Sequence, residues 1–220
     1  MTRALVFTGG GDYADPWHPY AESSEQLAEL IRSWGADVEV ADSVEPAIEA
    51  LADRPDLFVI NAGAGPDPQP HDRELAAAAI AHVEAGGDIL VVHLSTGLFP
   101  GDDAWEAMVG ARWIWDDGTG AAASGHPPRG PFRVLIEPDE LTAGLGDFTI
   151  DDESYSRLRL SDGSRVLASH RHDPDGVRHP LVFIRTHGAG RVIVDLLGHD
   201  AASFADPGHR DLLRRAVDPS

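Results

Sequence analysis

The stretch Gly87–Phe99, "GDILVVHLSTGLF", decides the fold class. Its apolar run from Ile89 to Val92 is short, which predicts a buried strand. The strand ends at His93, and the small residues of "STG" follow after one leucine. Open α/β sheets bind ligands at the carboxyl ends of their strands. We therefore interpret His93 as a candidate functional residue in a strand-to-helix turn.

The segments before this turn alternate between strand and helix patterns. Strands are predicted over residues 3–8, 37–41, 56–61 and 88–92, with helices over 23–35, 44–53 and 72–87 between them. Ser23 or Ser24 is the expected N-cap of the first helix. This order with short connections predicts a three-layer α/β/α fold whose sheet is doubly wound and mostly parallel, with right-handed crossovers.

The pattern changes after a short helix predicted within residues 101–113. Short strands follow over 131–137, 164–170, 180–186 and 191–197, and a terminal helix over 204–217. We expect these extra strands of the C-terminal half to extend the sheet in mixed orientation. No linker or low-complexity run interrupts the 220 residues, which predicts a single domain, residues 1–220.

The net charge of −20 limits the partners. Nucleic acid and anionic membranes would be repelled, so a neutral molecule, a cation or a metal ion fits better. A merely solvating acidic surface is the alternative interpretation. No apolar run has the length of a membrane helix, and "MTRALVFTGG" lacks the apolar core of a signal peptide. We expect a soluble, cytoplasmic protein that binds neither nucleic acid nor membrane.

Two missing residue types narrow the chemistry. The chain has no cysteine, which excludes disulfides, cysteine–zinc sites and a thiol nucleophile. All 17 basic residues are arginines, so Schiff-base chemistry and a Walker A lysine are excluded. No two histidines have the H-x-x-x-H spacing of a zincin. Histidines, carboxylates, hydroxyls and arginines remain for the chemistry.

Three further histidines lie in loops or at a strand end. His18 follows the first strand in "DPWHPY", beside Trp17, and His126 lies in "SGHPP". His199 ends the last strand, where Asp200 is expected to orient it, as carboxylates do for histidine ligands and bases. His187 lies in "HGAGR", which is interpreted as a structural turn into a strand, and the remaining histidines are interpreted as ordinary helix or surface residues: His71, His82, His170, His172, His179 and His209.

Three other motifs have competing interpretations. "HLSTG" approximates the G-x-S-x-G of serine hydrolases, but His93 replaces the first glycine and Ser95 is equally suited to cap the next helix. "DDESY", residues 151–155, is interpreted as a solvated acidic turn, and the alternative is that Tyr155 makes it a sugar-stacking or hydrogen-bonding surface. The acidic residues of "GGGDYAD", residues 9–15, argue against a phosphate-binding loop.

Several segments occur together in the order typical of one family. The chain resembles the ThuA-like (trehalose utilisation) family, whose members have a flavodoxin-like, class I glutamine amidotransferase-like fold. The resemblance covers almost the whole chain and rests on "LVFTGG…WHPY", "GGDILVVHLSTG", "WEAMVGARW", the Gly125–His126 pair, "LTAGLGDFTIDDESY" and "HGAGRVIVDLLGHD".

The resemblance implies a set of site residues. Amidotransferases of this fold have a cysteine at the turn after the strand, whereas ThuA-like proteins have histidine, so it implies no glutaminase activity. The family's recurring polar positions correspond here to His18, His93, His126, Glu153, Tyr155 and His199. Two positions depart from the family: Asp139–Glu140 stand where it usually has His-Pro, and His187 where it often has tyrosine.

The resemblance implies a role in carbohydrate metabolism, on trehalose or a related, including 3-keto, sugar. Imidazoles with a carboxylate suit general acid/base catalysis, with His93, His199, Glu153 and His18 as catalytic residues. They equally suit a divalent metal such as zinc, held by His93, His199 and Glu153. Tyr155, His126, Trp17 and Asp200 are then the candidates for binding the sugar.

Two hypotheses follow from this set of residues. We favour a sugar-processing hydrolase, lyase or isomerase, which requires these side chains to converge in one pocket. The alternative is a non-catalytic sugar-binding or regulatory protein on the same fold, which predicts scattered histidines. An esterase with Ser95 as nucleophile is a weaker third possibility, and a homo-oligomer is compatible with the fold.

Overall fold

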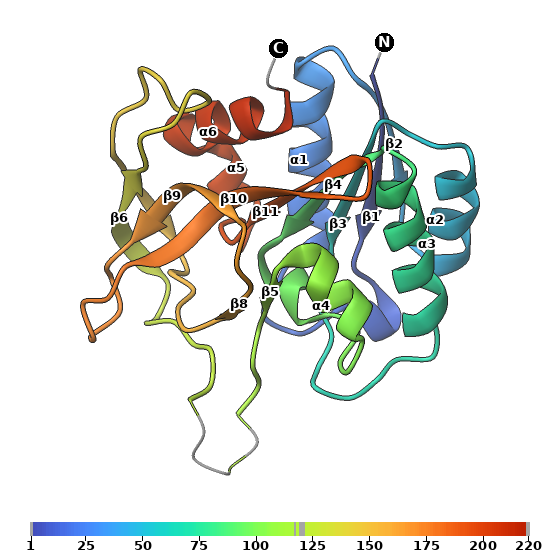
Figure 1. Cartoon of the computed structure of the whole chain (residues 1–220), viewed down its shortest axis with the longest axis horizontal. Coiled ribbons are helices and arrows are strands. Elements are labelled where there is room, and N and C mark those ends of the chain that lie inside the picture. The colour runs from blue at the N-terminus through green and yellow to red at the C-terminus, as the bar shows by residue number, and fades with distance from the viewer. Residues whose placement is uncertain (1, 117, 119–121, 219–220) are drawn as a thin grey trace.

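The computed structural model describes residues 2–116, 118 and 122–218. Within these residues one main sheet of nine strands forms the centre of the molecule (Figure 1). Its strands are β1 (Arg3–Thr8), β2 (Asp37–Ala41), β3 (Leu57–Asn61), β4 (Asp88–Val92), β6 (Gly130–Ile136), β7 (Phe148–Asp152), β9 (Arg165–His170), β10 (His179–His187) and β11 (Gly190–Asp195). A separate antiparallel pair consists of β5 (Ala111–Arg112) and β8 (Arg159–Leu160).

Helices cover both faces of the parallel part of the sheet. The first group, whose members contact one another, comprises α1 (Tyr20–Ser33), α5 (Ala201–Ala205) and α6 (Pro207–Val217). The second comprises α2 (Val44–Ala52), α3 (Asp72–Glu84) and α4 (Asp103–Val109). Figure 1 shows the two groups on opposite faces, as the predicted three-layer fold requires. Two short 3₁₀ helices, η1 (Gly11–Tyr13) and η2 (His93–Gly97), follow β1 and β4.

The sheet has the strand order β2-β1-β3-β4-β11-β10-β9-β6-β7. From β2 to β11 all neighbours are parallel, and their order corresponds to the 2-1-3-4-5 order of flavodoxin-like folds. From β11 to β7 all neighbours are antiparallel. The predicted fold class, including the mixed extension of the C-terminal half, is therefore confirmed.

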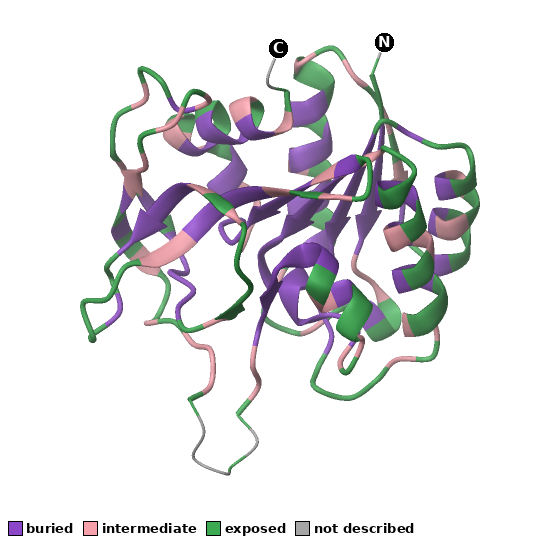
Figure 2. Ribbon diagram, viewed as in Figure 1, coloured by how far each residue is buried: buried purple, intermediate pink, exposed green. Residues whose placement is uncertain are grey.

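The apolar residues explain why these segments form the core. Figure 2 shows the central strands buried along most of their length, and every residue of β3 is buried. Strands covered on both faces read as continuous apolar runs, which is what the sequence shows here. On α1 the residues at helical spacing, Leu27, Leu30 and Ile31, face this core.

The structure corrects three expectations about local elements. Helix α1 begins at Tyr20, because the loop ends at Pro19, and Ser23 and Ser24 lie buried inside the helix rather than capping it. Their hydroxyls instead accept hydrogen bonds from Asn61 Nδ2, each at 3.0 Å. The terminal helix is divided into α5 and α6, since Asp206 caps a new helix with Pro207 in its first turn. Strand β7 was not predicted.

Candidate functional site

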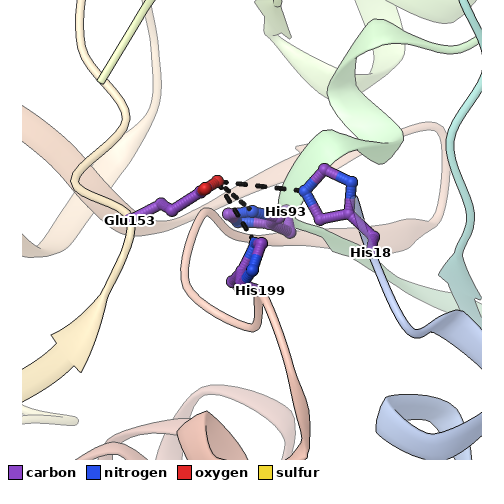
Figure 3. Close-up of side chains that lie close together, drawn as sticks. All are labelled: His18, His93, Glu153 and His199. Carbon is purple, nitrogen blue, oxygen red and sulfur yellow. Dashed lines mark hydrogen bonds and ion pairs between the residues drawn. The ribbon is translucent and has the colours of Figure 1, made fainter. Parts of the chain in front are cut away.

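Four side chains from distant segments converge where strands end. His18 follows β1, His93 follows β4, Glu153 follows β7 and His199 follows β11, and Figure 3 shows them directed at one point. Glu153 Oε2 lies 3.3 Å from His93 Nε2, 3.3 Å from His199 Nδ1 and 3.9 Å from His18 Nε2. We call these four residues the imidazole–carboxylate cluster. Its convergence in one place is what the enzymatic hypothesis required.

His93 is held by an unusual backbone conformation and a tertiary hydrogen bond. Its φ of +49° lies in the left-handed region, which is uncommon outside glycine and is found at functional turns. The ring is buried, and its Nδ1 lies 2.8 Å from the carbonyl oxygen of Leu196. A carbonyl only accepts, so Nδ1 carries the hydrogen and donates it. Since burial also lowers the pKa of His93, the neutral ring presents the lone pair of Nε2 to the cluster.

His18 is oriented by a carboxylate behind it. Its Nδ1 donates to Asp15, with both carboxylate oxygens within 2.8 Å, and the Tyr20 hydroxyl donates to Asp15 at 2.7 Å. Asp15 also accepts from the backbone N–H groups of Trp17 and His18, which fixes the loop. Burial disfavours a charged ring, but Asp15 and Glu153 outweigh it and raise the pKa of His18 to about 9.

Two nitrogens of the cluster are buried without a hydrogen-bond partner. They are His18 Nε2 and His199 Nδ1, and both point at the Glu153 carboxylate. Burial by itself would raise the pKa of Glu153, but its interactions with His18, His199 and His93 hold it well below the usual range. A negative carboxylate and inward-facing nitrogen lone pairs require a positive charge between them, supplied by a proton or by a metal ion.

The donor set fits a divalent metal ion. One atom from each of His18, His93, Glu153 and His199 lies within 4.8 Å of the others. Histidine nitrogens and a carboxylate oxygen are the ligands that zinc and related metals use in catalytic sites. The Nδ1 groups of His18 and His93 are hydrogen-bonded to a carboxylate and a carbonyl, the usual arrangement behind metal-binding histidines.

The cluster opens into a cavity of about 600 Å³, a volume typical of small-molecule sites. Aromatic rings dominate its walls. The ring of Tyr155 is stacked on the ring of His93, with centroids 4.0 Å apart, and on the ring of His126, with centroids 5.3 Å apart. The His126 side chain is 29% exposed, and its Nε2 lies 3.5 Å from Glu153 Oε2. The lining residues are Pro16, Trp17, His18, Leu94, Trp113, Trp115, His126, Glu153, Tyr155 and His199.

Two candidate residues lie elsewhere. The Asp200 side chain caps α5 by accepting from Ala202 N and pairs with Arg129, so it is not directed at His199 as expected. Ser95 is fully buried, accepts from Ala62 N and lies within 3.0 Å of two carbonyl oxygens. Its hydroxyl therefore links the end of β3 to the turn after β4. Because the Ser95 side chain is buried, it lacks the exposure that a nucleophile needs.

The acidic turn and two of the histidines were misassigned by sequence reasoning. Asp152 and Glu153 are buried, although Asp151 is exposed. His170 and His209 are fully buried rather than surface residues, because each has hydrogen-bond partners from distant segments. Local polarity was a poor guide here, since those partners are far away in the sequence.

Sequence reasoning also missed residues that build the site. Asp15 was not selected, although an acid three residues before a loop histidine is a recognisable signal for the pairing seen here. Trp113 and Trp115 line the cavity in the segment that follows β5, with ring centroids 6.1 Å apart, and their W-x-W spacing was the available sequence signal. The departing positions Asp139 and His187 pair with Arg165 and Glu84, and neither lines the cavity.

The fold and the site together define an α/β protein of the flavodoxin-like class with an imidazole–carboxylate cluster at the carboxyl ends of its strands. The chain belongs to the ThuA family, described as trehalose utilisation, whose model matches residues 3–218. The resemblance proposed from the sequence is therefore confirmed. None of the curated proteins matches this chain.

Solved structures share the fold at low sequence identity. A protein of Parabacteroides merdae described as ThuA-like has a TM-score of 0.79 at 19% identity, covering 99% of this chain and 88% of its own. A cytoplasmic protein of Salmonella typhimurium has a TM-score of 0.64 at 14% identity, covering 99% and 98%. A β-galactosidase of Bacillus circulans has a TM-score of 0.61 at 12% identity, with 99% of this chain matching 31% of that enzyme.

Among the residues that the structure describes, no helix combines the length and the apolar character needed to span a membrane.

Proposed function

We propose that this chain is a carbohydrate-processing enzyme that acts on trehalose or a related, including 3-keto, sugar. The observation that carries the proposal is the convergence of three imidazoles and one carboxylate at the floor of an aromatic-walled cavity. The family's description supports the substrate class. The acidic net charge favours a neutral ligand over an anionic one. We also propose that the protein acts in the cytoplasm.

We further propose that the cluster holds a divalent metal such as zinc. His93, His199 and Glu153 were the ligands expected from the sequence, and the orphaned Nε2 of His18 supports it as the fourth. A metal there would act as a Lewis acid toward a sugar oxygen or lower the pKa of a water molecule. Protonated His18 paired with Glu153 is the metal-free alternative, which would support acid/base catalysis instead.

The protein's own side chains have separate roles in this proposal. The indoles of Trp17, Trp113 and Trp115 would pack against the apolar CH face of a sugar ring, leaving its hydroxyls available for hydrogen bonds. His126 lies beside Glu153 and its side chain is in contact with water, so it can exchange a proton with both a substrate and the solvent. Tyr155 supports the rings of His93 and His126 by stacking.

The experiment compares turnover of sugars by the purified protein and by variants. The zinc-loaded protein is incubated with trehalose and 3-keto sugars, and products are followed by NMR. We expect product with the wild type, and a loss of about 100-fold or more in Glu153→Gln, because the variant removes the carboxylate of the cluster on which both forms of the proposed chemistry depend. His71→Gln is the matched control, because His71 pairs with Glu45 away from the cavity.

Three results would separate the hypotheses. Unchanged turnover in Glu153→Gln would reject the proposed chemistry of the cluster. Calorimetric binding of a sugar without any product would favour a non-catalytic sugar-binding protein. Neither binding nor product with any of these sugars would reject the substrate class.

A further inference from the structure

Behind the cluster lies a second set of polar side chains that the proposed function does not use. Asp152, Asp195, Ser203 and His209 are each at most 1% exposed. They come from β7, β11, α5 and α6, and they are joined by hydrogen bonds. Buried charged groups are costly unless they are paired, so such a set requires a structural or functional reason.

Asp152 holds the backbone of two cluster residues. Its Oδ1 accepts from the N–H of Glu153 at 2.7 Å and from the N–H of His199 at 3.3 Å. Its Oδ2 accepts from the N–H of Gly198 at 2.9 Å and from the Ser203 hydroxyl. One carboxylate therefore ties the end of β7 to the loop after β11, although the two segments lie far apart in the strand order.

Asp195 holds the beginning of the same loop. Its Oδ1 accepts from the N–H of Leu197 at 3.0 Å, and its Oδ2 lies 2.7 Å from His209 Nε2. Leu196, which lies between Asp195 and Leu197 in the chain, presents the backbone carbonyl that accepts from His93 Nδ1 and orients the His93 ring. The loop of residues 196–199 thus carries one cluster histidine and orients another, and both buried aspartates fix its backbone.

His209 joins the two aspartates and carries a positive charge. Ser203 has one hydroxyl hydrogen, and it donates this hydrogen to the Asp152 carboxylate. The Nδ1 of His209 faces only acceptors, namely the carbonyl of Ser203 at 2.9 Å and its hydroxyl oxygen at 3.0 Å. Its Nε2 faces the carboxylate of Asp195. Both ring nitrogens therefore carry hydrogens, and the imidazolium compensates the buried carboxylates.

This arrangement is not a hydrolytic triad, although it contains serine, histidine and aspartate. In a triad the histidine accepts the proton of the serine, whereas here the serine hydroxyl donates to Asp152 and the imidazole has no free lone pair. Ser203 is also buried and does not line the cavity.

We propose that Asp152 is a positioning residue for the imidazole–carboxylate cluster, anchored by Ser203, His209 and Asp195. The inference rests on the proposed metal-binding role of the cluster. Asp152 sets the backbone of Glu153 and His199, and the loop that it holds orients His93, so it acts on three of the four ligands. The distance tolerance of a metal site is small, and a shift of about 1 Å is enough to impair it.

The test measures metal binding rather than turnover. Co²⁺ is titrated into metal-free protein, and the affinity and visible absorption bands are recorded for the wild type and for Asp152→Asn. We expect affinity to fall about 10- to 100-fold, the range for residues that orient metal ligands, with altered absorption bands. Ser203→Ala, which keeps the carboxylate but removes its anchor, should shift both readouts in the same direction.

The control is Asp151→Asn, which removes the same charge from the adjacent, exposed residue. It should leave affinity and absorption unchanged. Circular dichroism establishes that each variant is folded. Wild-type affinity and absorption in both Asp152→Asn and Ser203→Ala would overturn the inference.

A second measurement separates this inference from the metal proposal. If the wild type binds no Co²⁺, the metal centre is rejected, and the positioning role is then tested by crystal structures of the wild type and the Ser203→Ala and Asp152→Asn variants. Displacement of the Glu153 and His199 side chains by about 1 Å or more would support the role. Superimposable side chains in both variants would overturn it.

Discussion

The carboxylate behind His18 offers the sharpest perturbation of the proposed metal site. Asp15 accepts hydrogen bonds from the His18 ring, the Tyr20 hydroxyl and two backbone N–H groups. In Asp15→Asn one oxygen becomes an NH₂ group, which cannot accept the hydrogen of Tyr20 or of the ring. The negative charge that increases the basicity of His18 is lost as well.

The expected effect is specific to metal binding. Loss of a carboxylate that orients a metal-binding histidine weakens binding about 10- to 100-fold, or about 1.4 to 2.7 kcal/mol. The assay is a competition titration of Zn²⁺ between the protein and a chromophoric chelator. Asp12→Asn is the matched control, since Asp12 lies in η1 three residues before Asp15, is exposed and carries the same charge.

If Asp15→Asn and Asp12→Asn bind Zn²⁺ with the same affinity as the wild type, then Asp15 does not act on a metal through His18. A fall in affinity of equal size in both variants would mean that general electrostatic attraction, rather than the hydrogen bond to the ring, explains the effect.

Three further predictions concern stability and sugar binding. Ser95→Ala leaves the N–H of Ala62 without its partner, so the free energy of unfolding in urea should fall by about 1–3 kcal/mol while Zn²⁺ affinity is unchanged; lost metal binding would contradict this. Trp17 is 71% exposed, so Trp17→Ala should leave the melting temperature unchanged but weaken sugar binding about 2- to 10-fold by calorimetry; unchanged affinity would remove Trp17 from the site. Burial disfavours a charged His209, but the carboxylates of Asp195 and Asp152 and the carbonyl of Ser203 outweigh it and raise the pKa of His209 to about 9. The contribution of His209 to the free energy of unfolding is therefore complete below pH 6.5 and is lost as the pH rises through about 9. If the wild type and His209→Gln show the same pH dependence of the free energy of unfolding, this prediction is wrong.

The parallel part of the fold was predictable because its signals are local. Each buried strand is a continuous apolar run, and each helix has apolar residues at helical spacing. The candidate residues at strand ends were predictable for the same reason, because parallel strands end at one edge of the sheet. His93 and His199 were identified from the places where apolar runs stop, and His18 from the loop after the first strand.

The buried polar residues were not predictable from local pattern. Asp152 and His209 have the polar neighbours of surface residues, yet their partners lie in other elements and exclude water from them. The start of α1 was misplaced for a related reason. Ser23 and Ser24 are residue types typical of an N-cap, but their hydroxyls accept hydrogen bonds from the Asn61 side chain of β3. A single sequence shows which residues are polar, and only the tertiary fold shows which of them are paired inside.

The proposed chemistry depends on His18, His93, Glu153 and His199 together binding one divalent metal ion. Elemental analysis of the purified protein, after removal of metals and reloading with Zn²⁺, tests it most directly. We expect one tightly held zinc per chain in the wild type and in Asp12→Asn, and almost none in a folded His18→Ala, His199→Ala double variant. Wild-type protein that retains no zinc, or a double variant that retains as much as the wild type, would contradict it.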